Sequence, residues 1–249
     1  MNIFVCISHV PDTTTKIQIG GSGKSIETSG VTFILNPYDE FGVEAGLQLK
    51  EAYGGEVTAI CVGPDVVKET IRKALAMGVD KGIHILAESE RDSYGVATVI
   101  SETLKQRNPD VIFCGRQSID YDGWQMVGYL GEMLGIPSIS VVSKLTIDAT
   151  GNVTAERDIE GGKEIVSSTL PCVISTQKGL NEPRYPKLQS IMAAKKKPIE
   201  EIKAGEYSTR LEVLSMHKPP VKQSGRIVGT DSSAVPELIR LLHEEAKVI

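Results

Sequence analysis

The sequence predicts a doubly wound α/β domain with a mainly parallel sheet, followed by an extended C-terminal arm. Two observations predict this architecture. Short apolar runs of strand length alternate with helical patterns, which favours a parallel sheet covered by helices on both faces. The alternation stops near residue 200, and the chain beyond is polar, punctuated by proline and without strong periodicity. We therefore expect an α/β domain over residues 1–200 and an arm over residues 201–249 that packs on another protein surface.

Five apolar runs account for the predicted parallel strands. They are Ile3–Ser8, Val57–Val62, Gly82–Leu86, Val111–Cys114 and Cys172–Thr176. Two further segments, Lys16–Leu35 and Lys144–Ser168, predict hairpins because each has turn residues at its centre. These are GGSGKS in the first and Ala-Thr-Gly-Asn, residues 149–152, in the second.

Apolar stripes at helical spacing lie between the strands. They run through Phe41, Ala45, Leu49 and Ala52; Val67, Ile71, Ala74 and Leu75; Ala97, Ile100 and Leu104; and Trp124, Val127, Gly131 and Leu134. Such stripes are typical of helices that pack one side on a core. A last helix is expected over Pro236–Ala246, with three leucines on one side.

Composition limits the class of protein. The chain has 249 residues, 41% of them hydrophobic, so it can bury one large core. Its net charge of −5 argues against a nucleic-acid-binding surface. No apolar run reaches the roughly 18 residues of a membrane-spanning helix. Because the N-terminal NIFVCIS has the pattern of a strand rather than a signal sequence, we expect a soluble, cytoplasmic protein without membrane insertion.

Residues that could hold a metal or perform acid–base chemistry are scattered. The four cysteines each lie singly in a β-like run, with no CxxC pair, which is typical of buried thiols in a reducing compartment. The four histidines show no ligand spacing, so the sequence predicts no metal site. No Ser–His–Asp set or close carboxylate pair occurs at a recognisable spacing either. GGSGKS fails the Walker pattern, because Gln18 stands where the first glycine is required.

Two loops that follow predicted strands could hold a ligand, because carboxyl ends of parallel strands form the crevice of such sheets. The first, Asn36-Pro37-Tyr38-Asp39, is fully explained as a capped helix start. In the second, Gly115 to Gln125, Gly123 permits close backbone approach and the next helix offers free N–H groups to a phosphate. Asp120 and Asp122 would repel a phosphate and suit ribose hydroxyls, a base or backbone. A nucleotide site and a plain structural turn are both open for this loop.

A late segment differs from the rest of the domain. GLNEPRYPKLQSIMAAKKKPI, residues 179–199, follows a buried-looking strand and contains three prolines, an apolar Ile-Met pair and three consecutive lysines. Composition alone indicates a solvated basic loop. We call this segment the 179–199 loop.

Four segments are more specific in combination than separately. They are Asn36-Pro37-Tyr38-Asp39; Ala74-Leu75-Ala76-Met77-Gly78-Val79-Asp80; Gly115-Arg116-Gln117-Ser118-Ile119-Asp120; and Asn181-Glu182-Pro183-Arg184-Tyr185 with Lys195-Lys196-Lys197. Together they closely resemble the β subunit of electron transfer flavoprotein, over almost the whole chain. The resemblance implies a Rossmann-like domain with a buried adenine nucleotide, usually AMP, and a heterodimer with an α subunit that holds a redox-active FAD. Such dimers carry electrons from dehydrogenases, for example acyl-CoA dehydrogenases, to a membrane quinone reductase.

The resemblance also implies the residues that act. Those of the nucleotide site are Cys6, Asn36, Pro37, Tyr38, Asp39, Val62, Gly115, Arg116, Gln117, Ser118, Ile119, Asp120, Asp122, Gly123, Trp124, Gln125 and Met126. Tyr38 would also approach the FAD of the α subunit. In this family the 179–199 loop grips the partner dehydrogenase, with Leu188 as the apolar anchor and lysines around it. The docking residues are Arg184, Tyr185, Leu188, Ile191, Met192, Lys195, Lys196 and Lys197.

Two positions depart from the AMP-binding members, which usually have Asn and Thr near the phosphate. This chain has Trp124 and Met126 there, and neither supplies an amide or hydroxyl. Met126 is nearer the electron-bifurcating branch, in which a second FAD replaces AMP, whereas residues 157–162 and 181–185 resemble the non-bifurcating branch. We expect AMP, with a second FAD as the alternative. A non-redox nucleotide-binding module and a scaffold with a vestigial site are rival interpretations, against which the long arm argues.

Overall fold

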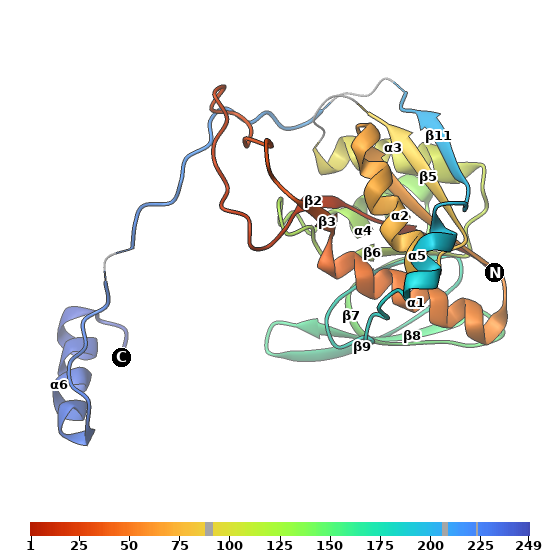
Figure 1. The fold of residues 1–249 in the computed structure, drawn as a ribbon. Coiled ribbons are helices and arrows are strands. Elements are labelled where there is room, and N and C mark those ends of the chain that lie inside the picture. The colour runs from red at the N-terminus through yellow and green to blue at the C-terminus, as the bar shows by residue number, and fades with distance from the viewer. Residues whose placement is uncertain (88–91, 206–208, 223) are drawn as a thin grey trace.

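The computed structural model describes residues 1–87, 92–205, 209–222 and 224–249. Within these residues, nine strands form one sheet in the order β11-β5-β4-β1-β6-β10-β7-β8-β9 (Figure 1). The strands from β11 to β7 in this order are parallel to their neighbours. β8 and β9 extend the sheet as an antiparallel meander. The predicted α/β fold with a mainly parallel sheet is confirmed.

The bounds of the five predicted parallel strands agree with the structure to within two residues. The strands are β1 (Asn2–Cys6), β2 (His9–Pro11), β3 (Phe33–Leu35), β4 (Glu56–Gly63), β5 (Lys81–Leu86), β6 (Val111–Gly115), β7 (Ser138–Ile147), β8 (Asn152–Ile159), β9 (Gly162–Thr169), β10 (Cys172–Thr176) and β11 (Ile199–Lys203). The helical elements are α1 (Pro37–Tyr53), η1 (Asp65–Val67), α2 (Lys68–Met77), α3 (Ser93–Lys105), α4 (Met126–Leu134), α5 (Leu188–Ala194), η2 (Ser232–Ala234), α6 (Val235–Arg240) and the π-helical η3 (Leu241–Glu245).

The core has two halves, one on each face of the sheet. Because side chains alternate along a strand, Ile3 and Val5 of β1 pack on the face that α1 and α2 cover. Phe4 and Cys6 pack on the opposite face, against α3 and α4. A parallel strand buried on both faces is apolar throughout, which explains why the central strands could be predicted from short apolar runs.

Two predicted boundaries differ from the structure. β11 crosses residue 200 and pairs with β5, so the sheet continues to Lys203, three residues into the segment assigned to the arm. α4 begins at Met126 rather than at Trp124. Asp122 and Trp124 have φ angles of 52° and 55°, in the left-handed region, and a right-handed helix cannot include such residues.

The two predicted hairpins have different outcomes. The hairpin over Lys144–Ser168 is confirmed, since β7 and β8 are antiparallel and joined at residues 148–151. The hairpin over Lys16–Leu35 is reduced to a single bridge between Ile19 and Ile26. Its final strand, β3, pairs with β2 in a separate ribbon instead.

Beyond β11 the chain leaves the domain and ends in α6 and η3, far from the sheet (Figure 1). The start of this arm is held by the domain. Asp92 accepts the backbone N–H groups of Arg210 and Leu211 at 2.6 and 2.9 Å, and Gly23 accepts that of Met216 at 2.7 Å. Gly23 belongs to GGSGKS, so this turn holds the arm through a backbone hydrogen bond.

Candidate functional site

A cavity lies where the connections of the sheet change direction. From the central strand β1 the chain passes outward to β4 and β5, then returns to β6 on the other side of β1. In open α/β sheets, ligands bind beyond the carboxyl ends of the strands at such a switch point. Here the ends of β1, β4 and β6 border a cavity of about 260 Å³. This volume lies near the lower end of small-molecule pockets, about 300 Å³.

Most of the predicted nucleotide-site residues line this cavity. They are Cys6, Asp39, Val62, Gly115, Arg116, Gln117, Ser118, Asp120, Gly123, Trp124, Gln125 and Met126. The predicted residues outside the lining are Asn36, Pro37, Tyr38, Ile119 and Asp122. Lining residues that the sequence analysis missed include Ile7, Ser8 and His9 after β1, Pro64 after β4, and Ser93 and Val96 of α3. Those after β1 and β4 could have been found from the rule on strand ends alone.

Asp39 fastens the ends of two strands to the start of α1. Its carboxylate accepts the backbone N–H of Ser8 at 2.7 Å on one oxygen and that of Gly115 at 3.0 Å on the other. A Cβ at position 115 would collide with this carboxylate, so glycine is required there. Burial raises the pKa of Asp39 to about 7, although both hydrogen bonds favour the charged form. Asp39 therefore acts first as a clamp that shapes the cavity wall.

Asn36 holds the second loop against the first. Its Nδ2 donates to the carbonyl of Gln117 at 2.9 Å, and its Oδ1 accepts the backbone N–H of Ile119 at 3.2 Å. The side chain makes no capping bond to α1, so the expected capping role is wrong. Fully buried Asn36 instead fixes the conformation of the loop that lines the cavity.

Arg116 lies between two aromatic rings. Its guanidinium carbon is 5.1 Å from the ring centroid of Tyr38 and 4.1 Å from that of Trp124, within the range of cation–π attraction. Nη1 donates to Gln177 at 3.0 Å, which further fixes the side chain. Among the described lining residues, Arg116 is the one lysine or arginine, so it supplies the permanent positive charge of the cavity. Tyr38 does not line the cavity itself, but it contacts Arg116, which does.

The start of α4 is a second feature that favours an anion. The first N–H groups of an α-helix have no acceptor within the helix, and no side chain caps this one. Residues 123–126 line the cavity, so the helix begins at its wall. Met126 stands beside them and offers no hydrogen bond of its own.

His9 contributes a polar atom that the sequence analysis did not single out. Its Nδ1 lies 2.7 Å from the hydroxyl of Thr70, and its ring stacks on Phe33 at 4.4 Å. Its Nε2 is buried without a partner among the described residues. Burial, assisted by Lys73, lowers the pKa of His9, so the ring is neutral at neutral pH. This nitrogen is therefore an unsatisfied polar atom of a residue that lines the cavity.

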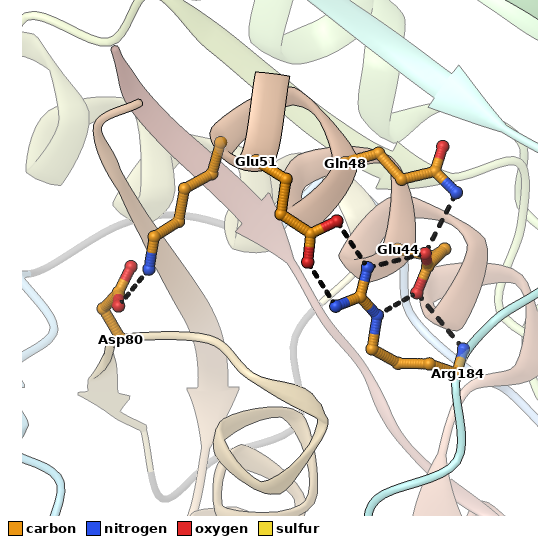
Figure 2. Close-up of polar contacts among 6 residues, drawn as sticks. Glu44, Gln48, Glu51, Asp80 and Arg184 are labelled. Atoms are coloured by element: carbon orange, nitrogen blue, oxygen red, sulfur yellow. Dashed lines mark hydrogen bonds and ion pairs between the residues drawn. The ribbon is translucent and has the colours of Figure 1, made fainter. Parts of the chain in front are cut away.

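The 179–199 loop is tied to α1 at its start. The guanidinium of Arg184 lies between the carboxylates of Glu44 and Glu51, at 2.8 and 2.6 Å (Figure 2). Gln48 donates to Glu44 at 3.0 Å, which holds the nearly buried carboxylate in place. The hydrogen bond from Arg184 lowers the pKa of Glu51. Arg184, predicted to dock a partner, is therefore engaged within the chain.

At its other end the loop is tied to α2. Arg72 donates to the carbonyls of Ala194 and Lys197 at 2.7 and 2.5 Å. Lys197 in turn donates to the carbonyls of Leu75 and Val79, at the C-terminal end of α2, at 3.0 and 2.6 Å. Cations stabilise this end of a helix. Lys197 thus anchors the loop, in contrast to its predicted docking role.

Between these anchors, apolar side chains point outward around α5. Tyr185, Leu188 and Met192 are 94%, 76% and 57% exposed. Ile191, Lys195 and Lys196 are exposed beside them. We call these six residues the docking patch. A contiguous apolar surface with adjacent charges is typical of a protein-interaction site.

Comparison with known proteins agrees with these features. Residues 24–207 match the family model described as "Electron transfer flavoprotein domain". The chain is 40% identical to "Electron transfer flavoprotein subunit beta" of Bacillus subtilis, over all of both chains. It is 36% identical to the mitochondrial subunit beta of Arabidopsis thaliana, over 100% of both, and 35% identical to subunit beta of Mus musculus, over 96% of both. The chain belongs to the electron transfer flavoprotein β-subunit family.

Membership in the electron transfer flavoprotein family confirms the resemblance seen in the sequence and makes the chain an electron-transfer protein. The four cysteines are free and buried, as expected. Across the described ranges, no helix has the length and apolar character needed to cross a membrane.

Proposed function

We propose that this chain is the β subunit of a heterodimeric electron transfer flavoprotein. The dimer carries electrons from dehydrogenases, such as acyl-CoA dehydrogenases, to a membrane quinone reductase, and it works in the cytoplasm. The observation that carries the proposal is similarity along the entire chain to proteins named as β subunits from a bacterium and a plant. The redox-active FAD is held mainly by the α subunit, with Tyr38 near it.

The C-terminal arm is the proposed contact with the α subunit. Leu238 and Ile239 of α6 are 43% and 51% exposed, and Leu211 and Leu214 nearer the domain are 68% and 75% exposed. Apolar side chains of this size contribute about 1.5–3 kcal/mol each when they are transferred from water into an interface core. A permanent contact with the α subunit would cover these apolar side chains, which explains why the arm carries them.

The cavity is the proposed site of AMP. Arg116 and the N–H groups at the start of α4 would hold the phosphate, because both favour an anion. AMP provides no redox chemistry, so its proposed role is structural: it would occupy the cavity at the ends of the strands. The small volume of about 260 Å³ supports a mononucleotide, and the Trp124 ring on the wall leaves less room for a flavin.

The nucleotide content of the purified heterodimer tests this function. The chain is expressed with its α subunit, the dimer is denatured, and the released nucleotides are counted by chromatography. One FAD and one AMP per dimer are expected. Two FAD molecules would instead support an electron-bifurcating dimer, which the aliphatic Met126 at the cavity favours. A dimer without any flavin would refute the electron-carrier function.

A matched pair of variants sharpens this count. Arg116→Gln removes the positive charge at the cavity, so AMP is expected to dissociate during purification while FAD is retained. Arg157→Gln is the control, because Arg157 pairs with Glu164 on the meander, outside the cavity lining. It is expected to retain AMP fully. Equal AMP loss from both variants would contradict the placement of the phosphate.

A further inference from the structure

Three side chains of metal-binding type converge at one edge of the sheet. Asp65 lies in η1 after β4, His84 in β5 and Glu201 in β11. The parallel register of β5 and β11 sets His84 opposite Glu201. One ligand atom from each of the three residues lies within 4.8 Å of the others. None of the three lines the nucleotide cavity, so the cluster is separate from the proposed AMP site.

His84 is held in the state that a metal requires. Its Nε2 lies 2.9 Å from the carbonyl oxygen of Gly63, and because a carbonyl can only accept, Nε2 carries the hydrogen. In the neutral ring, the lone pair is therefore on Nδ1. That atom is buried without a hydrogen-bond partner in the described ranges, 3.7 Å from a carboxylate oxygen of Glu201. Metal-binding histidines characteristically donate their other ring N–H to a backbone carbonyl or carboxylate.

Lys68 occupies the space between the two carboxylates. Its ammonium lies 2.5 Å from Asp65 and 2.6 Å from Glu201. The two carboxylates thus share this one ammonium. One ammonium against two carboxylates leaves a net negative charge, and Nδ1 of His84 remains unpaired. A divalent cation would satisfy both deficits, because it balances the two charges and accepts the nitrogen lone pair.

We propose that Asp65, His84 and Glu201 bind a divalent transition-metal ion of the zinc class, with displacement of the Lys68 ammonium into solvent. One imidazole with two carboxylates suits zinc and its neighbours, whereas calcium and magnesium prefer oxygen ligands throughout. Around a tetrahedral ion with bonds of about 2.0–2.1 Å, the ligand atoms lie about 3.3 Å apart. The carboxylates can close to this spacing, since the side chains of Asp65 and Glu201 are 77% and 44% exposed.

The ion would have a structural role. Its ligands come from three separate segments, and one of them is β11, the edge strand from which the arm departs. A metal that joins β11 to β5 and η1 would fix the last strand to the sheet. Binding to the folded chain alone also raises its thermal stability, because the three ligands are together only in the fold.

Zn²⁺ titration of the full-length chain tests the site. A chromophoric chelator competes for the ion and reports affinity, and one Zn²⁺ per chain is expected. Asp65→Asn and Glu201→Gln should each weaken Zn²⁺ binding about 10-fold or more. Loss of a residue that hydrogen-bonds a metal ligand typically weakens binding about 10-fold or more, and loss of the ligand itself should weaken it at least as much. Lys68→Gln should tighten binding, because it removes the competing ammonium.

Glu200→Gln is the matched control. Glu200 precedes Glu201 in β11 but pairs with Arg107 at 2.6 Å, so this variant should bind Zn²⁺ like the unmodified chain. These variants alter exposed or, at Lys68, half-buried side chains, which avoids the folding risk of replacing buried His84. Visible absorption of bound Co²⁺ gives a second readout, expected in the unmodified chain and lost in Glu201→Gln. The proposal is overturned if the unmodified chain takes up no Zn²⁺ at micromolar free ion, if Glu201→Gln binds it equally, or if Lys68→Gln does not tighten binding.

Discussion

The 179–199 loop and the C-terminal arm both present apolar side chains to solvent, but they are held in opposite ways. The loop is fixed at both ends, by Arg184 on α1 and by Lys197 on α2. Among the described residues, the arm is held over its first part, where Asp92 and Gly23 accept its backbone N–H groups, and α6 lies far from the sheet (Figure 1). The exposed apolar surface is thus pre-formed on the 179–199 loop, whereas on the C-terminal arm it is carried by an extended chain.

This difference indicates two kinds of partner. A pre-formed patch loses little conformational entropy on binding, so a small contact suffices and the complex can separate again quickly. An extended arm loses more entropy when it is ordered, and only a large, lasting interface compensates for that loss. The loop therefore fits the proposed transient contact with a dehydrogenase, and the arm fits the proposed permanent contact with the α subunit.

Removal of the arm should have the largest effect. A chain that ends at residue 204 keeps all strands of the sheet, because β11 ends at Lys203. We expect co-purification with the α subunit to be lost completely, while circular dichroism of the truncated chain keeps its α/β spectrum. If the truncated chain still binds the α subunit at equal stoichiometry, the arm is not the permanent contact. The proposed difference between the arm and the 179–199 loop would then be wrong.

Leu188→Ala should produce the next largest effect. Loss of a central apolar anchor typically costs about 2 kcal/mol or more of binding, equivalent to about 30-fold in affinity. We expect kcat/KM for electron transfer from the dehydrogenase to fall about 10-fold or more, with flavin content and thermal stability unchanged. Ile165→Ala is the control, since Ile165 is 73% exposed on β9, outside the docking patch. Equal transfer rates for both variants would remove Leu188 from the docking surface.

Arg184→Met tests whether the loop is pre-formed by its anchors. It leaves the nearly buried Glu44 carboxylate without its cation, and for a pair that is partly exposed we expect about 1–2 kcal/mol of lost unfolding free energy. Lys24→Met is the matched variant on the arm side. Its pair with Glu212 is exposed, so about 0.5 kcal/mol or less is expected. Urea denaturation measures both, and equal values would show that loop and arm are held alike.

The smallest expected effect is a pH dependence of the same anchor. Because Arg184 lowers the pKa of Glu51 below its ordinary value of 4.5, this contribution to stability is complete above that pH and is lost as the pH falls through the lowered pKa. The pair is exposed, so a few tenths of a kcal/mol are involved. Thermal unfolding of the wild type and of Glu51→Gln should differ at pH 6 and converge at an acid pH below the lowered pKa of Glu51. A constant difference across this range would contradict the assignment.

Patterns within short segments were sufficient for the parallel strands β1, β4, β5, β6 and β10 and for the main helices, because burial on both faces gives such a strand a continuous apolar run. β11 was not predicted, since IEEIK at a sheet edge has too few buried residues to produce such a run. The delayed start of α4 depends on left-handed backbone at Trp124, which no residue preference indicates for tryptophan.

The candidate site was predictable where the resemblance supplied motifs and less so where distant segments meet. Nothing in the sequence indicated that Arg184 would pair with Glu44, which lies 140 positions earlier in the chain. His9 carried no motif, and its unpaired Nε2 became visible only through its packing against Phe33 and Thr70. The cluster of Asp65, His84 and Glu201 is likewise invisible to spacing rules, because three separate segments contribute to it.

The position of β1 at the centre of the sheet sets the order in which the chain can fold during synthesis. β1 emerges first, yet its partners are β4 and β6, with registers that begin at Glu56 and Val111. At about 5–20 residues per second, several seconds pass before β4 can pair with it, and more before β6 arrives. Contacts of such long sequence separation form slowly in any case. The arm follows all of these strands in the chain, so the sheet from β5 to β10 can already be formed when the arm emerges. Under the proposed function, α6 would therefore reach the α subunit from a domain whose sheet is already formed.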